Sequence, residues 1–307
     1  MADGCNLYLT ESDLIQAQNS LKVGYLKNTE NDAQTMLDLY IKNNVEEFKK
    51  TIFDSSKPQY KIIDDLLRKA FKNDLSDTDL NHLPKALLTI LNVDPNVHGI
   101  FHSIPKPRGE YSSPLQHAGE LILGAAIIQK EEINTSLGNL IIDKNDLKIS
   151  FGQKYFGEHY VSNKTLEADL QLYLKQSNIG VDIKYSKTST HYGIKNDSFN
   201  NSLEKIRNCF ADGSLNGYYF ISNVEFSESF INKINEYNIL IFQDRLTRDL
   251  DMQNNFEYLA NIEKKGSLIS ASIEELKSVL DVDHLNLIAK KYDIPQIGYC
   301  EKIKFEG

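Results

Sequence analysis

Tryptophan is absent from this 307-residue chain, and cysteine, methionine and proline are scarce, with three, three and seven residues. Cys5, Cys209 and Cys300 are far apart and form no CxxC pair, which argues against a disulfide framework and against a zinc site. No apolar run approaches the length needed to cross a bilayer, and the first twenty residues lack a signal-peptide pattern. We therefore expect a cytoplasmic protein with no membrane contact.

Basic residues are outnumbered as well, because 34 Lys and Arg face 43 Asp and Glu, for a net charge of −9. Nucleic-acid-binding proteins usually carry a basic footprint. The charge is uneven, however, since residues 140–210 contain 10 basic and 8 acidic side chains. Local clustering, rather than net charge, decides contacts with phosphate, so an anion-binding function is not excluded for this segment. Many Asn and Lys without Trp suggest a low-GC bacterial genome.

Two short strands joined by a polar turn are predicted over residues 166–187. Apolar and polar side chains alternate along both strands, as in half-buried strands. The residues between the strands, 176–180, are rich in turn formers. If the strands pair as a hairpin with their polar faces on the same side, three charged side chains converge, namely Asp169, Asp182 and Lys184.

This convergence has a chemical meaning. Carboxylate oxygens such as those of Asp169 and Asp182 are the ligands that hard cations such as Mg²⁺ prefer. Lys184, on the same face, can stabilise a phosphate oxyanion and orient an attacking water. Metal and lysine together are sufficient for the hydrolysis of a phosphodiester, so the hairpin is the candidate site of that reaction.

Asp169, a spacer and then Asp182-Ile183-Lys184 resemble the D…(D/E)-x-K core of the PD-(D/E)XK nuclease superfamily, which includes many type II restriction endonucleases. The resemblance covers about residues 112–246. It departs from the pattern in two ways, because Ala168 stands where the pattern has proline and the half-motif is Asp-x-Lys rather than the commoner Glu-x-Lys.

Such folds usually begin with a helix that carries a further acidic residue. Residues 113–130 predict an amphipathic helix, and Glu120 within it matches that acidic residue. The resemblance implies that Asp169, Asp182 and Glu120 bind the metal, and that Lys184 positions the water. The alternative for Glu120 is an exposed acid on a helix, which is common. His117, beside it, is more often a packed or surface residue than a catalyst.

The acid-x-Lys triplet alone has little specificity, because the chain contains five of them. Asp146–Lys148 is the main rival to Asp182–Lys184, since a strand-like stretch follows it, but no acidic strand precedes it. The plain alternative for the whole hairpin is an ordinary solvated strand face. Spacing, parity and flanking elements together favour the site.

The remaining periodicity predicts an α/β fold. We expect a restriction-endonuclease-like mixed central sheet flanked by helices, with an appended α-helical N-terminal module. The expected division is a helical module over residues 1–95, a linker over 96–112, the nuclease-like core over 113–246 and a C-terminal helical extension over 247–307. Within these parts, helices are predicted at 31–53, 58–73, 78–92, 197–212, 227–237, 272–280 and 283–292, and strands at 217–222 and 238–242.

The resemblance implies a Mg²⁺-dependent DNA endonuclease, with Mn²⁺ as a substitute, of the type II restriction or bacterial defence kind. A homodimer would follow if both strands of a palindrome are cut. Two other hypotheses stay open from the sequence. One is a nuclease-fold protein that no longer cuts and serves as a binding or assembly module. The other is a different enzyme, in which the hairpin is plain solvated surface.

Overall fold

A computed structural model of the chain describes residues 75–93, 116–156, 165–174, 176–187, 191–193, 198–249 and 271–306, with isolated positions between residues 46 and 68 and at 252–253. The predicted linker lies outside the described residues, and so do most of the first two predicted helices. The division of the chain into four parts therefore stays a prediction. Only the third N-terminal helix is described in full, as α5 (Asp77–Val93).

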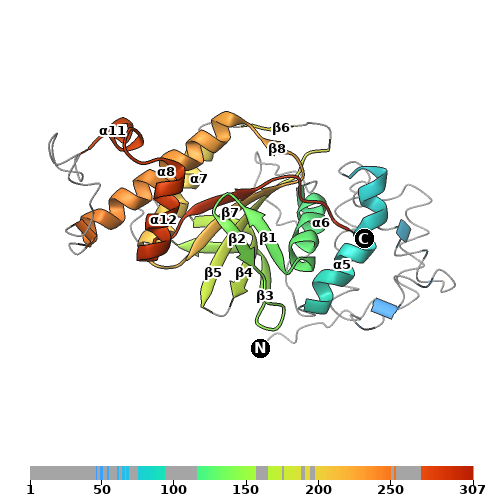
Figure 1. Cartoon of the computed structure of the whole chain (residues 1–307). Helices are drawn as coiled ribbons and strands as arrows, with labels where there is room; N and C mark the ends of the chain where they lie inside the picture. Colours follow the sequence, from blue (N-terminus) through green and yellow to red (C-terminus); the bar gives the residue numbers. More distant parts are fainter. Residues whose placement is uncertain are drawn as a thin grey trace, which may run out of the picture.

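A five-stranded mixed sheet lies at the centre of the molecule (Figure 1). Its strands, in spatial order, are β3 (Lys148–Phe156), β4 (Thr165–Leu174), β5 (Ser177–Lys184), β7 (Gly217–Ser222) and β9 (Ile297–Cys300). The β3–β4 and β4–β5 pairs are antiparallel, whereas β5–β7 and β7–β9 are parallel. The predicted hairpin is thus confirmed as β4–β5, in a mixed α/β fold.

Helices cover both faces of this sheet (Figure 1). On one face, α6 (Gln116–Gln129) packs on the strands and α5 packs against α6. The other face carries α7 (Ser198–Ala211), α8 (Glu228–Arg248) and, beside α8, the short α11 (Ile273–Lys277) and α12 (Val282–Tyr292). Each face buries its own apolar cluster, which is the usual way in which a sheet is stabilised between two helical layers.

Helix α8 differs from the prediction. Residues 238–242 are predicted as a strand, but they continue α8, which extends to Arg248. A short buried apolar run fits either structure, and here Ile239, Ile241 and Phe242 are all buried within the helix. The strand at the outer side of β7 is instead β9, which lies within residues 247–307, the range expected to be a helical extension.

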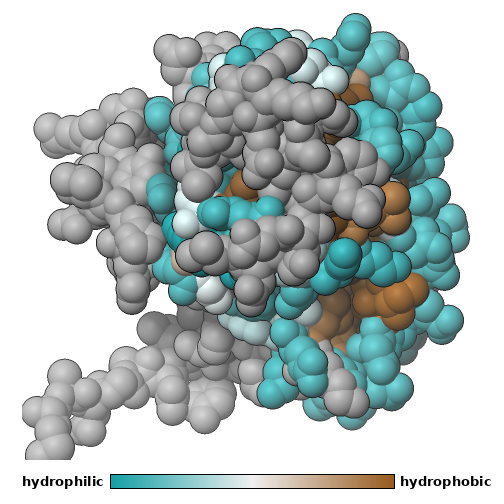
Figure 2. All heavy atoms as spheres, turned by 60° about the vertical axis from the view of Figure 1, so that its left-hand side comes forward, coloured by the Kyte–Doolittle hydropathy of each residue, from teal (hydrophilic) through white to brown (hydrophobic). Residues whose placement is uncertain are grey.

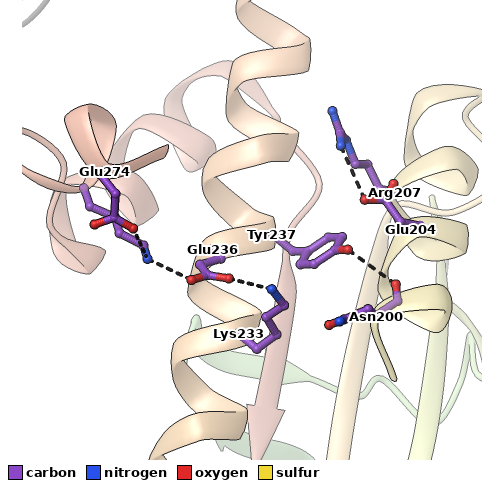
Figure 3. Close-up of polar contacts among 8 residues, drawn as sticks. Asn200, Glu204, Arg207, Lys233, Glu236, Tyr237 and Glu274 are labelled. Carbon is purple, nitrogen blue, oxygen red and sulfur yellow. Dashed lines mark hydrogen bonds and ion pairs between the residues drawn. The ribbon is translucent and has the colours of Figure 1, made fainter. Parts of the chain in front are cut away.

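Polar contacts connect α8 to its neighbours on both sides (Figure 3). Glu236 of α8 accepts from Lys233 and from Lys277 of α11, at 2.8 Å each. On the other side, the Tyr237 hydroxyl donates to the carbonyl of Asn200 in α7 at 3.4 Å. These contacts hold α7 and α11 at the two flanks of α8.

Two small sheets flank the main one. The hairpin β1 (Glu132–Thr135) and β2 (Gly138–Ile141) is antiparallel, and β6 (His191–Tyr192) pairs in parallel with β8 (Glu225–Phe226). On the face drawn in Figure 2 the described surface is mostly hydrophilic, with a few separate hydrophobic areas. Among the described residues, no helix has the length and apolarity that crossing a membrane requires.

Candidate functional site at the β4–β5 divergence

The candidate site lies where β4 separates from β5. The pairing of the two strands ends at Leu170 and Val181. Beyond that point the Asp169 carboxylate accepts a hydrogen bond from the Ile183 N–H, at 2.7 Å from Oδ2. A side chain therefore takes the place of the backbone acceptor that a continuing ladder would supply. Meanwhile β5 continues along β7 as far as Lys184.

The direction of the Asp169 side chain follows from a change in the alternation of β4. Leu166 and Ala168 pack in the cluster on the α7–α8 face, whereas Leu170 and Leu172 pack in the cluster on the α6 face. Residues of the same parity thus lie on opposite faces. The change occurs around Asp169, whose side chain extends along the sheet toward β5. Strict alternation places Asp169 on one polar face instead, so this detail of the prediction is corrected.

Asp182 and Lys184 lie on β5 opposite Phe220 and Ser222 of β7. The Lys184 amine forms an ion pair and a hydrogen bond with Asp182 Oδ1. The side chain of Lys184 is 22% exposed and that of Asp182 is 16% exposed, so the pair is largely withdrawn from water but reachable. The structure therefore brings the two residues of the half-motif together at the end of the sheet.

Glu120 approaches the cluster from α6. Its charge acts on Asp169, whose pKa is raised well above the usual range by burial first, then by the charge of Glu120 and then by Asp182. Lys184 opposes this rise. The four residues singled out in the sequence, from three elements, are therefore gathered at one place.

The charge state of Lys184 is set by the same neighbours. Burial by itself lowers the pKa of this amine, but the charges of Asp182 and Asp169 outweigh burial, and the pKa is raised above its ordinary value. The amine therefore stays an ammonium group at neutral pH. It can donate hydrogen bonds and offset negative charge, but it cannot serve as a base.

The donor set suits a hard divalent cation, because it contains three carboxyl groups and a single ammonium group, and the pKa of Asp169 is raised first by burial and then by repulsion from Glu120 and Asp182. As the side chains stand, however, no group of three or more His, Cys, Asp or Glu within the described part of the chain is arranged to hold a metal ion. Asp182 is paired with Lys184 and Asp169 is bonded to the backbone. A cation would have to compete with the Asp182–Lys184 pair.

Three helices begin at this end of the sheet. Glu120 lies in the second turn of α6, while α7 and α8 begin soon after β6 and β8. Helix N-termini carry partial positive charge and unpaired N–H groups, which favour anions.

Other candidates from the sequence are placed elsewhere or not described. The side chain of His117 lies outside the described residues. Asp146 and Lys148, the rival triplet, are exposed, and Lys148 pairs with Tyr173 near the opposite end of β4.

Two tyrosines near the site were not singled out from the sequence. Tyr185 follows Lys184, and its hydroxyl donates to Asp79 of α5. Tyr192 of β6 interacts electrostatically with Lys184, Asp182 and Asp169. Tyr185 continues the apolar parity of its strand, and Tyr192 follows a polar run, so neither pattern indicated a role at the site.

Comparisons with known proteins add little to this geometry. No family model and no curated protein matches the chain. Among solved structures, it is similar to a crystal structure of a protein of unknown function, AF1548, with a TM-score of 0.23 and 12% identity, over 49% of this chain and 91% of that chain.

Proposed function

We propose that this protein hydrolyses phosphodiester bonds with the help of Mg²⁺, as a DNA endonuclease of the restriction or bacterial defence type. The observation that carries the proposal is the meeting of Asp169, Asp182 and Lys184 where β4 and β5 diverge, with Glu120 beside them. The resemblance to the PD-(D/E)XK superfamily supplies the reaction and the substrate class.

Each side chain has a distinct role in this proposal. Asp169, Asp182 and Glu120 would hold Mg²⁺, with Mn²⁺ as a substitute. When bound, the cation would activate water and offset charge on the phosphate. Lys184, kept as an ammonium group by its acidic neighbours, would hydrogen-bond to a phosphate oxygen and to the attacking water. The hydrogen bond from the Ile183 N–H fixes the Asp169 side chain at the point where β4 and β5 diverge.

A second candidate is a nuclease-fold module that binds a partner but does not cut. The Asp182–Lys184 ion pair favours this reading, because it engages a carboxylate that the cation would need. The absence of a ready metal-holding group among the described residues favours it too. A cleavage assay separates the two candidates. Both predict a folded protein, but only the first predicts cutting that depends on a divalent cation.

The test is plasmid cleavage with Mg²⁺ or Mn²⁺. Asp182→Asn and Lys184→Met should each slow cleavage by about 10²- to 10³-fold, because the first removes a ligand of the cation and the second removes the ammonium group that offsets charge on the reacting phosphate. The matched controls are Asp146→Asn and Lys148→Met, which alter the rival triplet at the other end of β4 and should cut like wild type. An inactive wild type with either cation, or full activity in folded Asp182→Asn, would contradict the proposal.

A further inference from the structure

Strands β6 and β8 place Tyr192 beside the ends of β5 and β7. Ser186 N–H donates to the Asn223 side chain and the Asn223 amide donates back to the Ser186 carbonyl, at 2.8 Å each. These two bonds hold the chain after β5 to the turn after β7. Strand β8 follows that turn, and Phe226 of β8 pairs with Tyr192 of β6. Tyr192 is therefore fixed to the same end of the sheet as Lys184.

The ring of Tyr192 is held by aromatic neighbours. It meets Phe226 and Phe230 edge to face, with centroid distances of 6.1 and 6.0 Å. Its backbone carbonyl accepts from the Ser227 N–H at 2.8 Å, which joins it to the start of α8. Two ring contacts and a backbone bond leave the side chain little freedom, and preorganised groups of this kind serve binding sites well.

The hydroxyl of Tyr192 has a different environment from the ring. Within the described part of the chain it makes no hydrogen bond, although it is partly buried and interacts with the charges of Lys184, Asp182 and Asp169. A tyrosine hydroxyl is a neutral donor at pH 7. Burial raises the pKa of this one further, while the charge of Lys184 opposes the rise and those of Asp182 and Asp169 add to it. A neutral donor beside an ammonium group suits an anionic oxygen, since it adds a hydrogen bond without adding charge.

We propose that Tyr192 is a substrate-binding residue of the site, and that its hydroxyl donates a hydrogen bond to a non-bridging oxygen of the phosphodiester that Lys184 contacts. The inference rests on the proposed function and names a residue that the D…(D/E)-x-K pattern does not contain. The donor acts on bound substrate before and during reaction alike, so it should affect KM more than kcat.

Tyr192→Phe tests this proposal, because it removes the hydroxyl and keeps the ring between Phe226 and Phe230. Tyr299→Phe is the matched control, since Tyr299 also meets Phe226 edge to face but the charge that acts on it is that of Glu301. Binding of a short fluorescein-labelled DNA duplex is measured by anisotropy with Ca²⁺ in place of Mg²⁺, and cleavage kinetics are measured with Mg²⁺. Thermal unfolding of both variants checks that the fold is kept.

Tyr192→Phe should weaken duplex binding and raise KM by about 10-fold, the effect of one hydrogen bond to a charged group, with kcat nearly unchanged. Tyr299→Phe should match wild type. Equal binding by the two variants overturns the role of Tyr192, while cleavage by wild type would still uphold the proposed function. A wild type that binds DNA but never cuts it overturns the proposed reaction, and the binding constants then still test Tyr192. A wild type that does not bind the duplex overturns both.

Discussion

At the scale of single residues, Tyr185 connects the candidate site to helices α5 and α6. The residue follows Lys184, its ring packs against Gly119 of α6, and its hydroxyl donates to Asp79 of α5. Burial first, and then the bond to Asp79 and its charge, raise the pKa of Tyr185 above the ordinary value. One side chain thus fixes the end of β5 against two helices.

This raised pKa predicts a loss of stability at alkaline pH. Unfolded tyrosine ionises near pH 10, whereas Tyr185 in the folded chain stays protonated to higher pH. The contribution is fully present below about pH 10 and is lost as the pH rises toward the folded pKa, with a slope of at most about 1.4 kcal/mol per pH unit. Because the side chain is only partly buried, the measured slope should be smaller.

Urea unfolding of wild type and Tyr185→Phe at several pH values between neutral and strongly alkaline isolates this contribution from that of the other tyrosines. The variant should be less stable by about 1–2 kcal/mol at neutral pH, because it loses a hydrogen bond to a carboxylate. The difference should shrink once the pH exceeds about 10. A difference that stays constant across the range would show that Tyr185 titrates alike in both states.

The sequence predicts which candidate residues lie near one another better than it predicts the direction of their side chains. A short turn suffices to bring Asp169, Asp182 and Lys184 near one another, because a hairpin fixes register, although parity alone misplaces the side chain of Asp169. The bond from Ile183 to Asp169 depends on where β4 stops pairing with β5. That divergence is set by packing on both faces of the sheet, which no local pattern of residues encodes. The contact between Tyr185 and Asp79 joins positions 106 residues apart and is equally hidden.

At the scale of elements, glycine controls how closely α6 approaches the sheet. A Cβ at Gly119 would lie 2.6 Å from the Cβ of Tyr185, which is not tolerated without a shift of the helix. A Cβ at Gly124 would lie 3.1 Å from the ring of Phe151, a tight contact that a small movement relieves. The two glycines therefore differ in how strictly they are required, and Gly119 precedes Glu120.

Gly119→Ala should destabilise the protein by about 1–3 kcal/mol, because overpacking outweighs the gain in helix propensity. Gly124→Ala, in the same helix, should be close to neutral, since a propensity gain of about 1 kcal/mol offsets the tight contact. Chemical denaturation of both variants measures the contrast, and cleavage by the folded fraction of Gly119→Ala reports whether Glu120 has moved. Equal stability of the two variants would refute the claim that the Tyr185 contact limits the approach of α6.

Elements with clear signals are predicted well, and those decided by tertiary packing are not. The sequence of α11 has Ser272 and Glu275 at the spacing of a capping box, and both hydrogen bonds of that box form in the structure. Residues 238–242 have no such signal, and their burial inside α8 decides between helix and strand. β9 is only four residues long and lies 75 residues beyond β7, so its place in the sheet follows from topology alone.

At the scale of the whole molecule, the sheet must close the edge that β9 presents. One side of β9 pairs with β7, and the other side would leave backbone groups open. Asn238 of α8, which is buried, accepts from the Ile297 N–H and donates to the Ile297 carbonyl, at 2.8 Å each. Ser136 likewise bonds to both groups of Tyr299. Its hydroxyl accepts from the Tyr299 N–H and its backbone N–H donates to the Tyr299 carbonyl, at 3.0 Å each. Two polar residues thus substitute for a sixth strand.

Asn238→Ala should therefore cost about 2–4 kcal/mol of unfolding free energy, because it removes two hydrogen bonds and leaves a buried N–H and C=O without partners. Ser136→Ala is the matched comparison and should cost about 1 kcal/mol, since it loses only the hydroxyl bond of a partly exposed residue. Urea unfolding measures both changes, and light scattering of the folded proteins measures association through the opened edge. Association is expected for Asn238→Ala, because an unpaired strand edge is a template for another strand. Equal costs for the two substitutions would mean that water replaces Asn238 at Ile297, and that packing of α8 alone protects the edge.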